Sequence, residues 1–139
     1  MARRSQIPAA MIAVMAQNER HAWTLEDLQA ALARSGMRAD FSSVFRAARK
    51  LVAEGRIRKL ALEDGRACFE PVSAHHDHLQ CTRCGALVPV PCAIPRRTLA
   101  AIEARSGVAI TDHQVMFVGL CPSCRTSGGG RRRAGRPSR

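Results

Sequence analysis

The chain has 139 residues, six cysteines and a formal net charge of +11 at pH 7. This length allows one domain or two small ones, and small domains that bury little core commonly need a metal for stability. It contains no stretch of about 18 apolar residues, which excludes a helix that spans a membrane. The positive charge favours a polyanionic partner, although much of it comes from arginines in the last residues, 125–139.

Apolar periodicity predicts two helices in the first 36 residues. The first runs from Pro8, which suits a first helical turn, to about Asn18. The second follows Thr24, which forms a capping arrangement with Asp27, and Gly36 closes it.

A third helix, ended by Gly55, is predicted to have one apolar and one basic face. The apolar stripe consists of Phe41, Val44, Phe45, Ala48, Leu51 and Val52. The opposite face carries Ser42, Ser43, Arg46, Arg49 and Lys50. Taken alone, such a charge run is most simply explained as a solvated helix face.

A β-hairpin is predicted next, with strands at residues 57–62 and 66–69 around the turn Glu63-Asp64-Gly65. Three helices and a two-stranded wing make a winged helix-turn-helix, which places its third helix in the DNA major groove. We therefore expect Arg46 to contact guanine edges or phosphates, and Arg49 and Lys50 to contact phosphates. Arg58 and Lys59 would contact the DNA backbone from the wing.

Two Cys-x-x-Cys pairs, Cys81 with Cys84 and Cys121 with Cys124, predict a structural zinc site. Four thiolates can surround one zinc ion as a tetrahedron, with bonds of about 2.3 Å. Two disulfides or a redox pair are the alternatives. Because no apolar signal stretch follows Met1, we expect a cytoplasmic protein with reduced, zinc-bound cysteines.

A run of possible metal ligands, residues 75–78, precedes the first cysteine pair and reads His-His-Asp-His. Such borderline ligands suit a second, less closed site. Successive side chains of a strand point to opposite faces, so His76 and His78 share one face and His75 and Asp77 the other. Two different metal sites can therefore use one strand.

The rest of the second half predicts a small α/β module, with strands at residues 78–81, 86–90 and 114–120. Between them, Pro95 to Ser106 form a helix that buries Leu99 and Ile102. The fold class is therefore α+β. We expect a DNA-binding domain at residues 1–71, a metal-binding dimerisation domain at 72–125 and a disordered, arginine-rich tail at 126–139.

Three motifs resemble the ferric uptake regulator (Fur) family of bacterial metal-responsive repressors. Residues 43–46, Ser-Val-Phe-Arg, are similar to that family's Thr-Val-Tyr-Arg recognition-helix motif. Residues 75–85 are similar to its most specific motif, and His113 with residues 119–124 resembles its last strand. The resemblance, over about residues 5–125, implies a homodimeric, metal-dependent repressor of metal-homeostasis genes. Two-fold symmetry then predicts a near-palindromic operator in double-stranded DNA.

The resemblance also implies the residues of each site. The regulatory metal site would consist of His21, Glu70, His76 and His78. A second, weak site would consist of His75, Asp77 and His113. Together with the basic face of the third helix and the wing, the candidate DNA-binding residues are Ser42, Ser43, Phe45, Arg46, Arg49, Lys50, Arg58 and Lys59. His21 is as well explained as a surface or capping residue.

The chain departs from the family pattern at several positions. Pro89 replaces a carboxylate of the regulatory site, which leaves an N₃O donor set that suits zinc better than Fe²⁺ or Mn²⁺ and favours the zinc-uptake-regulator (Zur) branch. Arg96 stands where the second site usually has a glutamate. Phe45 replaces the tyrosine, and residues 5–8 lack the usual Thr-Pro-x-Arg start.

Two cysteines, Cys68 and Cys92, lie outside both pairs. They are interpreted first as small buried apolar side chains, with a place in the regulatory site as the alternative.

Other functional classes fit less well. An enzyme is not expected, because the four-cysteine site is closed and no His-Glu-x-x-His motif is present; no small organic substrate is implied. A zinc-stapled nucleic-acid-binding adaptor would need more stacking aromatic residues than one Trp, four Phe and no Tyr. An iron-responsive or peroxide-sensing regulator of the same family stays open.

Overall fold

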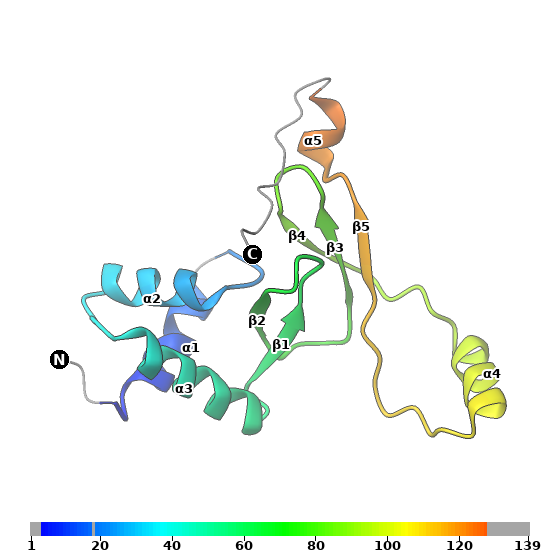
Figure 1. Ribbon diagram of the computed structural model, residues 1–139, viewed down its shortest axis with the longest axis horizontal. Helices are drawn as coiled ribbons and strands as arrows, with labels where there is room; N and C mark the ends of the chain where they lie inside the picture. The colour runs from blue at the N-terminus through cyan, green and yellow to red at the C-terminus, as the bar shows by residue number, and fades with distance from the viewer. Residues whose placement is uncertain (1–3, 18, 128–139) are drawn as a thin grey trace. The chain divides into compact units, whose positions relative to one another are not determined.

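Helices dominate the first half of the chain, whereas the second half contains both strands and helices (Figure 1). The computed structural model describes residues 4–17 and 19–127. Backbone contacts divide the chain into two units, residues 1–74 and 75–139. Most of the predicted tail, from residue 128 onward, lies outside the described residues. Within the described part, no helix is long and apolar enough to cross a membrane.

The first unit contains the three predicted helices, α1 (Ile7–Gln17), α2 (Leu25–Arg34) and α3 (Phe41–Ala53). The predicted end of the first helix, Asn18, lies outside the described residues. The predicted cap of α2 is confirmed as a capping box. Thr24 Oγ1 accepts from the Asp27 N–H at 3.1 Å, and the Asp27 carboxylate accepts from the Thr24 N–H at 2.9 Å.

Asp40 caps α3, and its carboxylate accepts from the Ser43 N–H at 2.8 Å. The hydroxyl of Ser42 and then the Ser43 N–H donate to this carboxylate, which holds the pKa of Asp40 well below its usual range. After α3 the chain turns at Gly55, whose φ of 68° is in the left-handed region that favours glycine. The cap and this turn fix both ends of the helix.

The core of the first unit is apolar and draws on all three helices and the wing. Its buried members are Ile7, Met11, Val14, Met15, Trp23, Leu28, Ala31, Leu32, Val44, Ala47, Ala48, Leu51, Ile57 and Phe69. The predicted stripe of α3 was wrong at Phe41 and Phe45, which are each 44% exposed. These two residues lie one turn apart on a row beside the inward one, and Ala47 fills the core instead.

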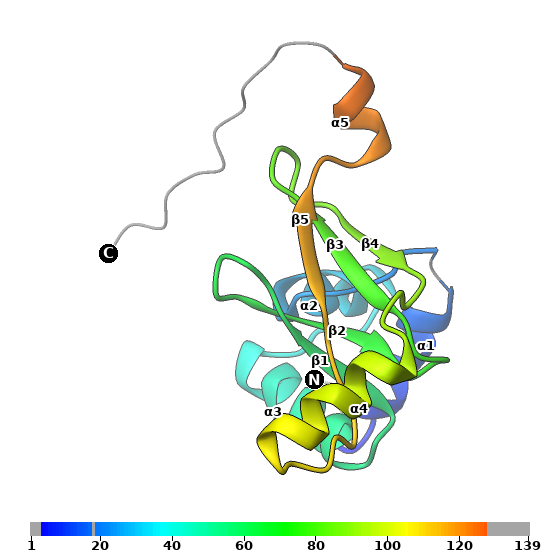
Figure 2. The same ribbon diagram turned by 90° about the vertical axis from the view of Figure 1, so that its right-hand side faces the viewer.

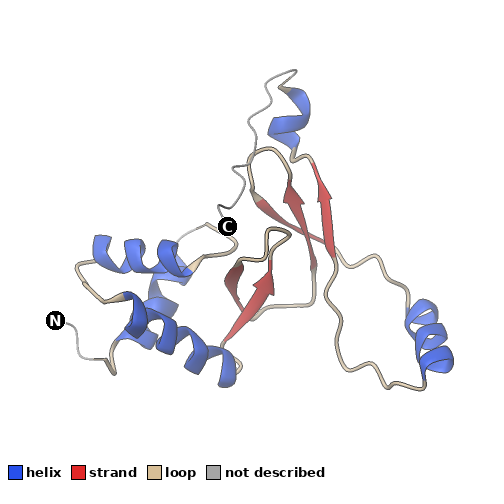
Figure 3. Ribbon diagram, in the orientation of Figure 1, coloured by secondary structure: helices blue, strands red, loops and turns tan. Residues whose placement is uncertain are grey.

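The predicted hairpin is present as β1 (Ile57–Ala61) and β2 (Ala67–Pro71), an antiparallel pair coloured red in Figure 3. Phe69 of β2 also exchanges backbone hydrogen bonds with Trp23, at 2.9 and 2.7 Å. This bridge fastens the segment before α2 to the wing. It therefore places the neighbouring residues His21 and Glu70 side by side.

The second unit is a three-stranded sheet with the order β4-β3-β5. The central strand β3 (Asp77–Cys81) pairs antiparallel with β4 (Leu87–Val90) and parallel with β5 (Met116–Gly119). The two remaining helices, α4 (Arg96–Ser106) and α5 (Pro122–Thr126), follow β4 and β5 along the chain (Figure 2). The short helix α5 was not predicted; it begins with Pro122 in its first turn.

The second unit has no apolar core comparable to the first among the described residues. Its buried side chains are Asp77, His78, Gln80, Cys81 and Cys121. The prediction that α4 buries Leu99 and Ile102 was wrong. No residue of that helix is buried, and Ile102 is 49% exposed. The helix stands apart from the sheet in Figure 1, and on its apolar side Leu99 is only partly buried while Ile102 is exposed.

Candidate metal centres and DNA-binding surface

The sheet register brings the two cysteine pairs to one end of the second unit. Cys81 ends β3 opposite Gly119 of the parallel strand β5, and Cys121 follows two residues later. Parallel strands present their carboxyl ends at the same edge of a sheet. The Thr82 N–H donates to the Gly119 carbonyl at 2.8 Å and fixes the first pair against the second.

The four predicted cysteines converge as free thiols. Their four Sγ atoms all lie within 4.8 Å of one another. The Sγ atoms of Cys84 and Cys121 are 3.8 Å apart. A tetrahedron of sulfurs at about 2.3 Å from a central zinc ion has edges of about 3.8 Å. The donor set and its spacing therefore fit zinc.

The surrounding backbone already favours negative charge at this cluster. Hydrogen bonds from the backbone N–H groups of Cys121 and Cys84 lower the pKa of Cys81 to about 6. Burial and hydrogen bonds with the neighbouring thiols raise the pKa of Cys124 to about 12. Four thiolates side by side repel one another, so full ionisation needs a cation among them.

A second cluster lies at the opposite end of the same sheet and joins His75, Asp77 and His113, as predicted, with Cys92. The Nε2 atoms of His75 and His113 are 3.0 Å apart. His113 Nε2 is also 3.2 Å from Cys92 Sγ. The buried Asp77 carboxylate lies 3.9 Å from His75 Nε2. Two imidazoles, a carboxylate and a thiol therefore face one another.

Cys92 is the residue of this cluster that the sequence analysis missed. The register of β3 with β4 contained the information, because Asp77 pairs with Val90 in antiparallel strands. Continued two residues past the end of β4, this register brings Cys92 opposite His75. Arg96, which stands at the position of the usual glutamate, begins α4 and is exposed.

The residues predicted for the regulatory site form a pair within each unit. In the first unit, His21 Nε2 lies 2.8 Å from Oε2 of Glu70, which is only 1% exposed. In the second unit, the rings of His76 and His78 contact each other edge to face, with centroids 4.7 Å apart. The structure also shows the predicted sorting of the run, in which His75 lies with Asp77 and His76 with His78.

The basic face of α3 is exposed. Arg46, Arg49 and Lys50 all point to solvent, and the Arg49 guanidinium lies over the Phe45 ring at 5.9 Å from its centroid. Arg46 is within 3.4 Å of the hydroxyls of both Ser42 and Ser43. Of the predicted contacts only Ser43 is buried, and its hydroxyl donates to Asp40 at 2.8 Å.

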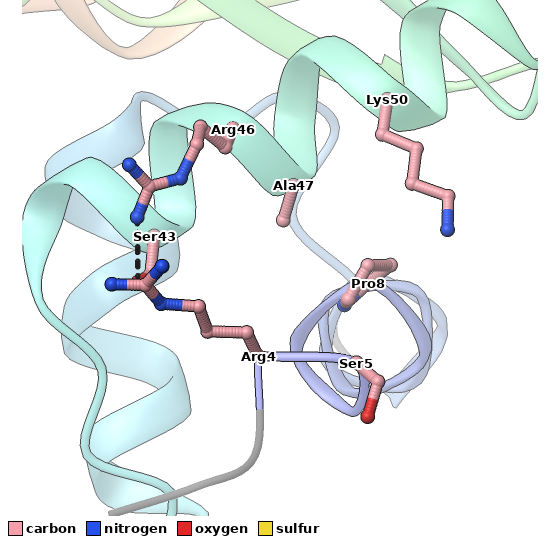
Figure 4. Close-up of a pocket in the computed structure, with 7 residues that line it drawn as sticks. All are labelled: Arg4, Ser5, Pro8, Ser43, Arg46, Ala47 and Lys50. Atoms are coloured by element: carbon pink, nitrogen blue, oxygen red, sulfur yellow. Dashed lines mark hydrogen bonds between the residues drawn. The ribbon is translucent and has the colours of Figure 1, made fainter.

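A small surface pocket adjoins this face at the start of α1 (Figure 4). Its lining residues are Arg4, Ser5, Pro8, Ser43, Arg46, Ala47 and Lys50. The side chain of Arg4 reaches towards Ser43 and Arg46, so three cationic groups surround one concave surface. Arg4 was not among the predicted contacts, because sequence order does not show that the start of α1 meets α3.

The wing presents the two other predicted basic side chains. Lys59 of β1 is exposed, whereas Arg58 is half-buried and pairs across the hairpin with Glu70 in the strand register. Concave cationic surfaces attract phosphates, which bring the charge and hydrogen-bond acceptors that guanidinium and ammonium groups favour. The first unit thus has a surface whose shape and positive charge suit the binding of nucleic acid.

Comparisons with known proteins identify relatives of this chain. Residues 3–118 match the ferric uptake regulator family. A ferric uptake regulation protein of Legionella pneumophila is 30% identical over 115 residues, which cover 82% of this chain and 85% of that protein. The solved Vibrio cholerae ferric uptake regulator superposes with a TM-score of 0.71 at 25% identity, covering 83% of this chain and 88% of that one.

The fold is also shared with the Helicobacter pylori ferric uptake regulator, whose structure reveals three functional metal binding sites. That comparison has a TM-score of 0.74 at 18% identity and covers 89% of this chain and 83% of that one. The family match spans both units, including the recognition helix and the histidine-rich run. The chain therefore belongs to the ferric uptake regulator family and is a metal-responsive regulator, not an enzyme.

Proposed function

We propose that this chain is a cytoplasmic, homodimeric repressor that binds a near-palindromic operator of metal-homeostasis genes when a divalent metal, preferably zinc, is available. The observation that carries the proposal is the exposed basic face of α3, capped by Asp40 and joined by a basic pocket. The same chain offers clustered thiol, imidazole and carboxylate groups, the ligands that proteins use for zinc. This combination fits a regulator whose DNA binding depends on a bound metal ion.

Cys81, Cys84, Cys121 and Cys124 would hold a structural zinc. Bound there, zinc would supply a cross-link between the end of β3 and the start of α5. The backbone donors to Cys81 and the hydrogen bond from Arg83 to the Cys124 carbonyl, at 2.6 Å, pre-arrange this end of the sheet. His75, Asp77 and His113 would form the second site.

The regulatory site is proposed to use His21 and Glu70 from the first unit with His76 and His78 from the second. The close His21–Glu70 pair and the His76–His78 ring contact each support one half of it. Shared ligands would favour one orientation of the two units, the one in which both recognition helices fit the operator. Linkage then requires operator DNA to strengthen metal binding by the same factor, about 5- to 150-fold.

The dimer is proposed to form through the second unit. Its exposed large apolar side chains are Ile102, Val108, Phe117, Val118 and Leu120. Phe117 and Val118 belong to β5, which lies at the edge of the sheet. Clustered apolar side chains on an edge strand and on an uncovered helix are typical of a surface that another copy buries.

Arg46 is proposed to read base edges, while Arg49, Lys50, Lys59 and Arg58 bind phosphates. Arg4 joins them as a phosphate ligand, because its guanidinium lines the same pocket as Arg46. Ser43 would act through Asp40 and Arg46 rather than by direct contact, since it is buried.

The first test measures DNA binding as a function of metal. The zinc-loaded full chain selects a duplex from a random pool, and anisotropy then follows binding after mild chelation and after anaerobic addition of Zn²⁺, Fe²⁺ or Mn²⁺. We expect chelation to weaken binding to the selected duplex, and zinc to restore it at the lowest free concentration. Native mass spectrometry should show one retained zinc per chain and further ions that reload.

Each other result has a definite meaning. Restoration by Fe²⁺ in preference to zinc would identify an iron-responsive or peroxide-sensing regulator. Selected-duplex binding that is indifferent to chelation would overturn the metal-dependent repressor. Failure to select any duplex, with RNA bound instead, would favour a zinc-stapled nucleic-acid-binding adaptor.

A variant sharpens the test on the recognition helix. Arg46→Ala is expected to lose about 1–3 kcal/mol of discrimination between the selected and a scrambled duplex. Arg34→Ala is the matched control, because Arg34 is exposed with the same charge but ends α2. Equal losses in both variants would show that general charge, not base contact, is being measured.

A further inference from the structure

We propose that Cys92 is a metal ligand, and that its thiolate completes a four-ligand, zinc-selective site with His75, Asp77 and His113. The inference rests on the second site proposed above for its other three residues. It adds the donor that this chain uses where Arg96 replaces the usual carboxylate.

The sheet topology places these residues in one row. In the parallel pair, His78 lies opposite Met116, and the same register continued backward brings His75 opposite His113. In the antiparallel pair, continuing from Asp77 and Val90 brings Cys92 opposite His75. The order β4-β3-β5 therefore sets Cys92, His75 and His113 side by side across the amino end of β3.

The distances suit a single small cation. His113 Nε2 lies 3.0 Å from His75 Nε2 and 3.2 Å from Cys92 Sγ, and Asp77 lies 3.9 Å from His75. Ligand atoms at about 2.0–2.3 Å from a tetrahedral zinc are separated by about 3.3–3.8 Å. The observed separations bracket that range, so small side-chain rotations would bring the four atoms onto one ion.

The Asp77 carboxylate gives an independent reason for a cation here. Its side chain is completely buried, and Oδ1 accepts from the Val115 N–H at 3.2 Å. Its Oδ2 atom is also buried and has no hydrogen-bond partner within the described part of the chain. A buried carboxylate oxygen without a partner is costly unless a charge compensates it. A metal ion held by the neighbouring imidazoles and thiolate supplies that charge.

The donor set predicts which metal the site selects. Three ligands from His75, Asp77 and His113 would leave an open position that several divalent ions could use. A thiolate at the fourth position closes the tetrahedron and adds a soft donor, which favours zinc over Mn²⁺ and Mg²⁺. Cys92 is only partly buried, so metal can reach the site from solvent.

Cobalt spectroscopy tests the proposal, because a Co²⁺ ion bound by a thiolate shows a near-ultraviolet charge-transfer band. The full chain is loaded with one zinc at the four-cysteine cluster, then titrated anaerobically with Co²⁺ while its zinc content is monitored. We expect the band to grow while that zinc is retained. Cys92→Ala should lose the band and bind one metal ion fewer in native mass spectrometry.

Cys68→Ala is the matched control, since Cys68 is the other cysteine outside the two pairs and is buried in the first unit. This control should keep the full band. A band that persists in Cys92→Ala, or that disappears in Cys68→Ala instead, would overturn the proposal.

A measurement on the unaltered chain guards against a variant that fails to fold. The alkylation rate of Cys92 is followed by peptide mass spectrometry, with and without a second equivalent of zinc. Protection of Cys92 is expected, and an unchanged rate would contradict the assignment. Metal-dependent DNA binding by Cys92→Ala is scored separately, so failure of this site and failure of the proposed repressor function give different results.

Discussion

The first unit buries Met11, Leu28, Val44 and Leu51 against one another, whereas the buried side chains of the second unit are mainly polar groups and cysteines. Burial of apolar surface is enough to stabilise a small helical domain. A three-stranded sheet with an uncovered helix buries too little apolar surface to be stable in the same way. We therefore expect the second unit to depend for its stability on a metal ion and on a second copy of the chain, and the first unit to be stable without either.

The sharpest way to separate the units is to remove the four-cysteine site. Structural zinc sites contribute an apparent binding free energy of about 10–16 kcal/mol, which is as large as the whole stability of a small domain. Cys121→Ser is therefore expected to unfold the second unit and leave the first folded. Hydrogen exchange should show lost protection in β3, β4 and β5, with α1 to α3 unchanged.

Ser123→Ala controls for this change, since Ser123 lies in the same Cys-x-x-Cys pair and offers no thiolate. It should retain zinc and full protection of the sheet. If Cys121→Ser left β3 protected, the second unit would have a source of stability other than the metal.

The converse change removes apolar volume from the first unit. Leu28 is fully buried, and Leu→Ala in such positions costs about 2–5 kcal/mol through lost burial and the remaining cavity. Leu28→Ala should lower the unfolding midpoint of the first unit in urea, followed by the fluorescence of Trp23, the single tryptophan. Its zinc content should stay that of the original protein. Loss of zinc would show that the two units unfold together.

The sequence predicted the first unit well because its signals are local. The capping pair of Thr24 and Asp27, the glycine after α3 and the hairpin turn each act within a few residues. Phe41 and Phe45 were misplaced because a helical repeat allows two neighbouring rows to look apolar, and only packing decides which one faces inward.

The second unit was harder to predict because its contacts join distant residues. The cysteine spacing was informative, because a tetrahedral zinc site needs all four thiolates. Cys92 was missed because its partner His113 is brought close by strand register and not by sequence spacing. The prediction that Ile102 is buried was wrong, because an amphipathic helix can direct its apolar side to another molecule as well as to its own sheet.

Ile102 therefore offers a test of what covers the second unit. Its side chain is 49% exposed, and burial of such a side chain contributes up to about 1.5–3 kcal/mol. Ile102→Asp should raise the dimer dissociation constant measured by analytical ultracentrifugation. Val72→Asp is the matched control, because Val72 is 52% exposed but belongs to the first unit. Equal weakening in both variants would place the dimer contact elsewhere.

The smallest effect expected concerns the charge that caps the recognition helix. Hydrogen bonds from the Ser42 hydroxyl and the Ser43 N–H hold the pKa of Asp40 below its ordinary value of 3.8. A carboxyl whose pKa is lowered by folding stabilises the protein above its unfolded pKa, and this stabilisation is lost as the pH falls through the folded pKa.

Asp40→Asn keeps a capping side chain but does not titrate. Its stability deficit, from urea unfolding followed at Trp23, should be largest above about pH 5 and shrink as the pH falls below about 4. Ser42→Ala, which removes the largest cause of the lowered pKa, should show the same trend with a smaller deficit. A deficit that did not change with pH would mean that Asp40 acts as a neutral cap, and the difference between the units would then involve apolar packing and metal ligands alone.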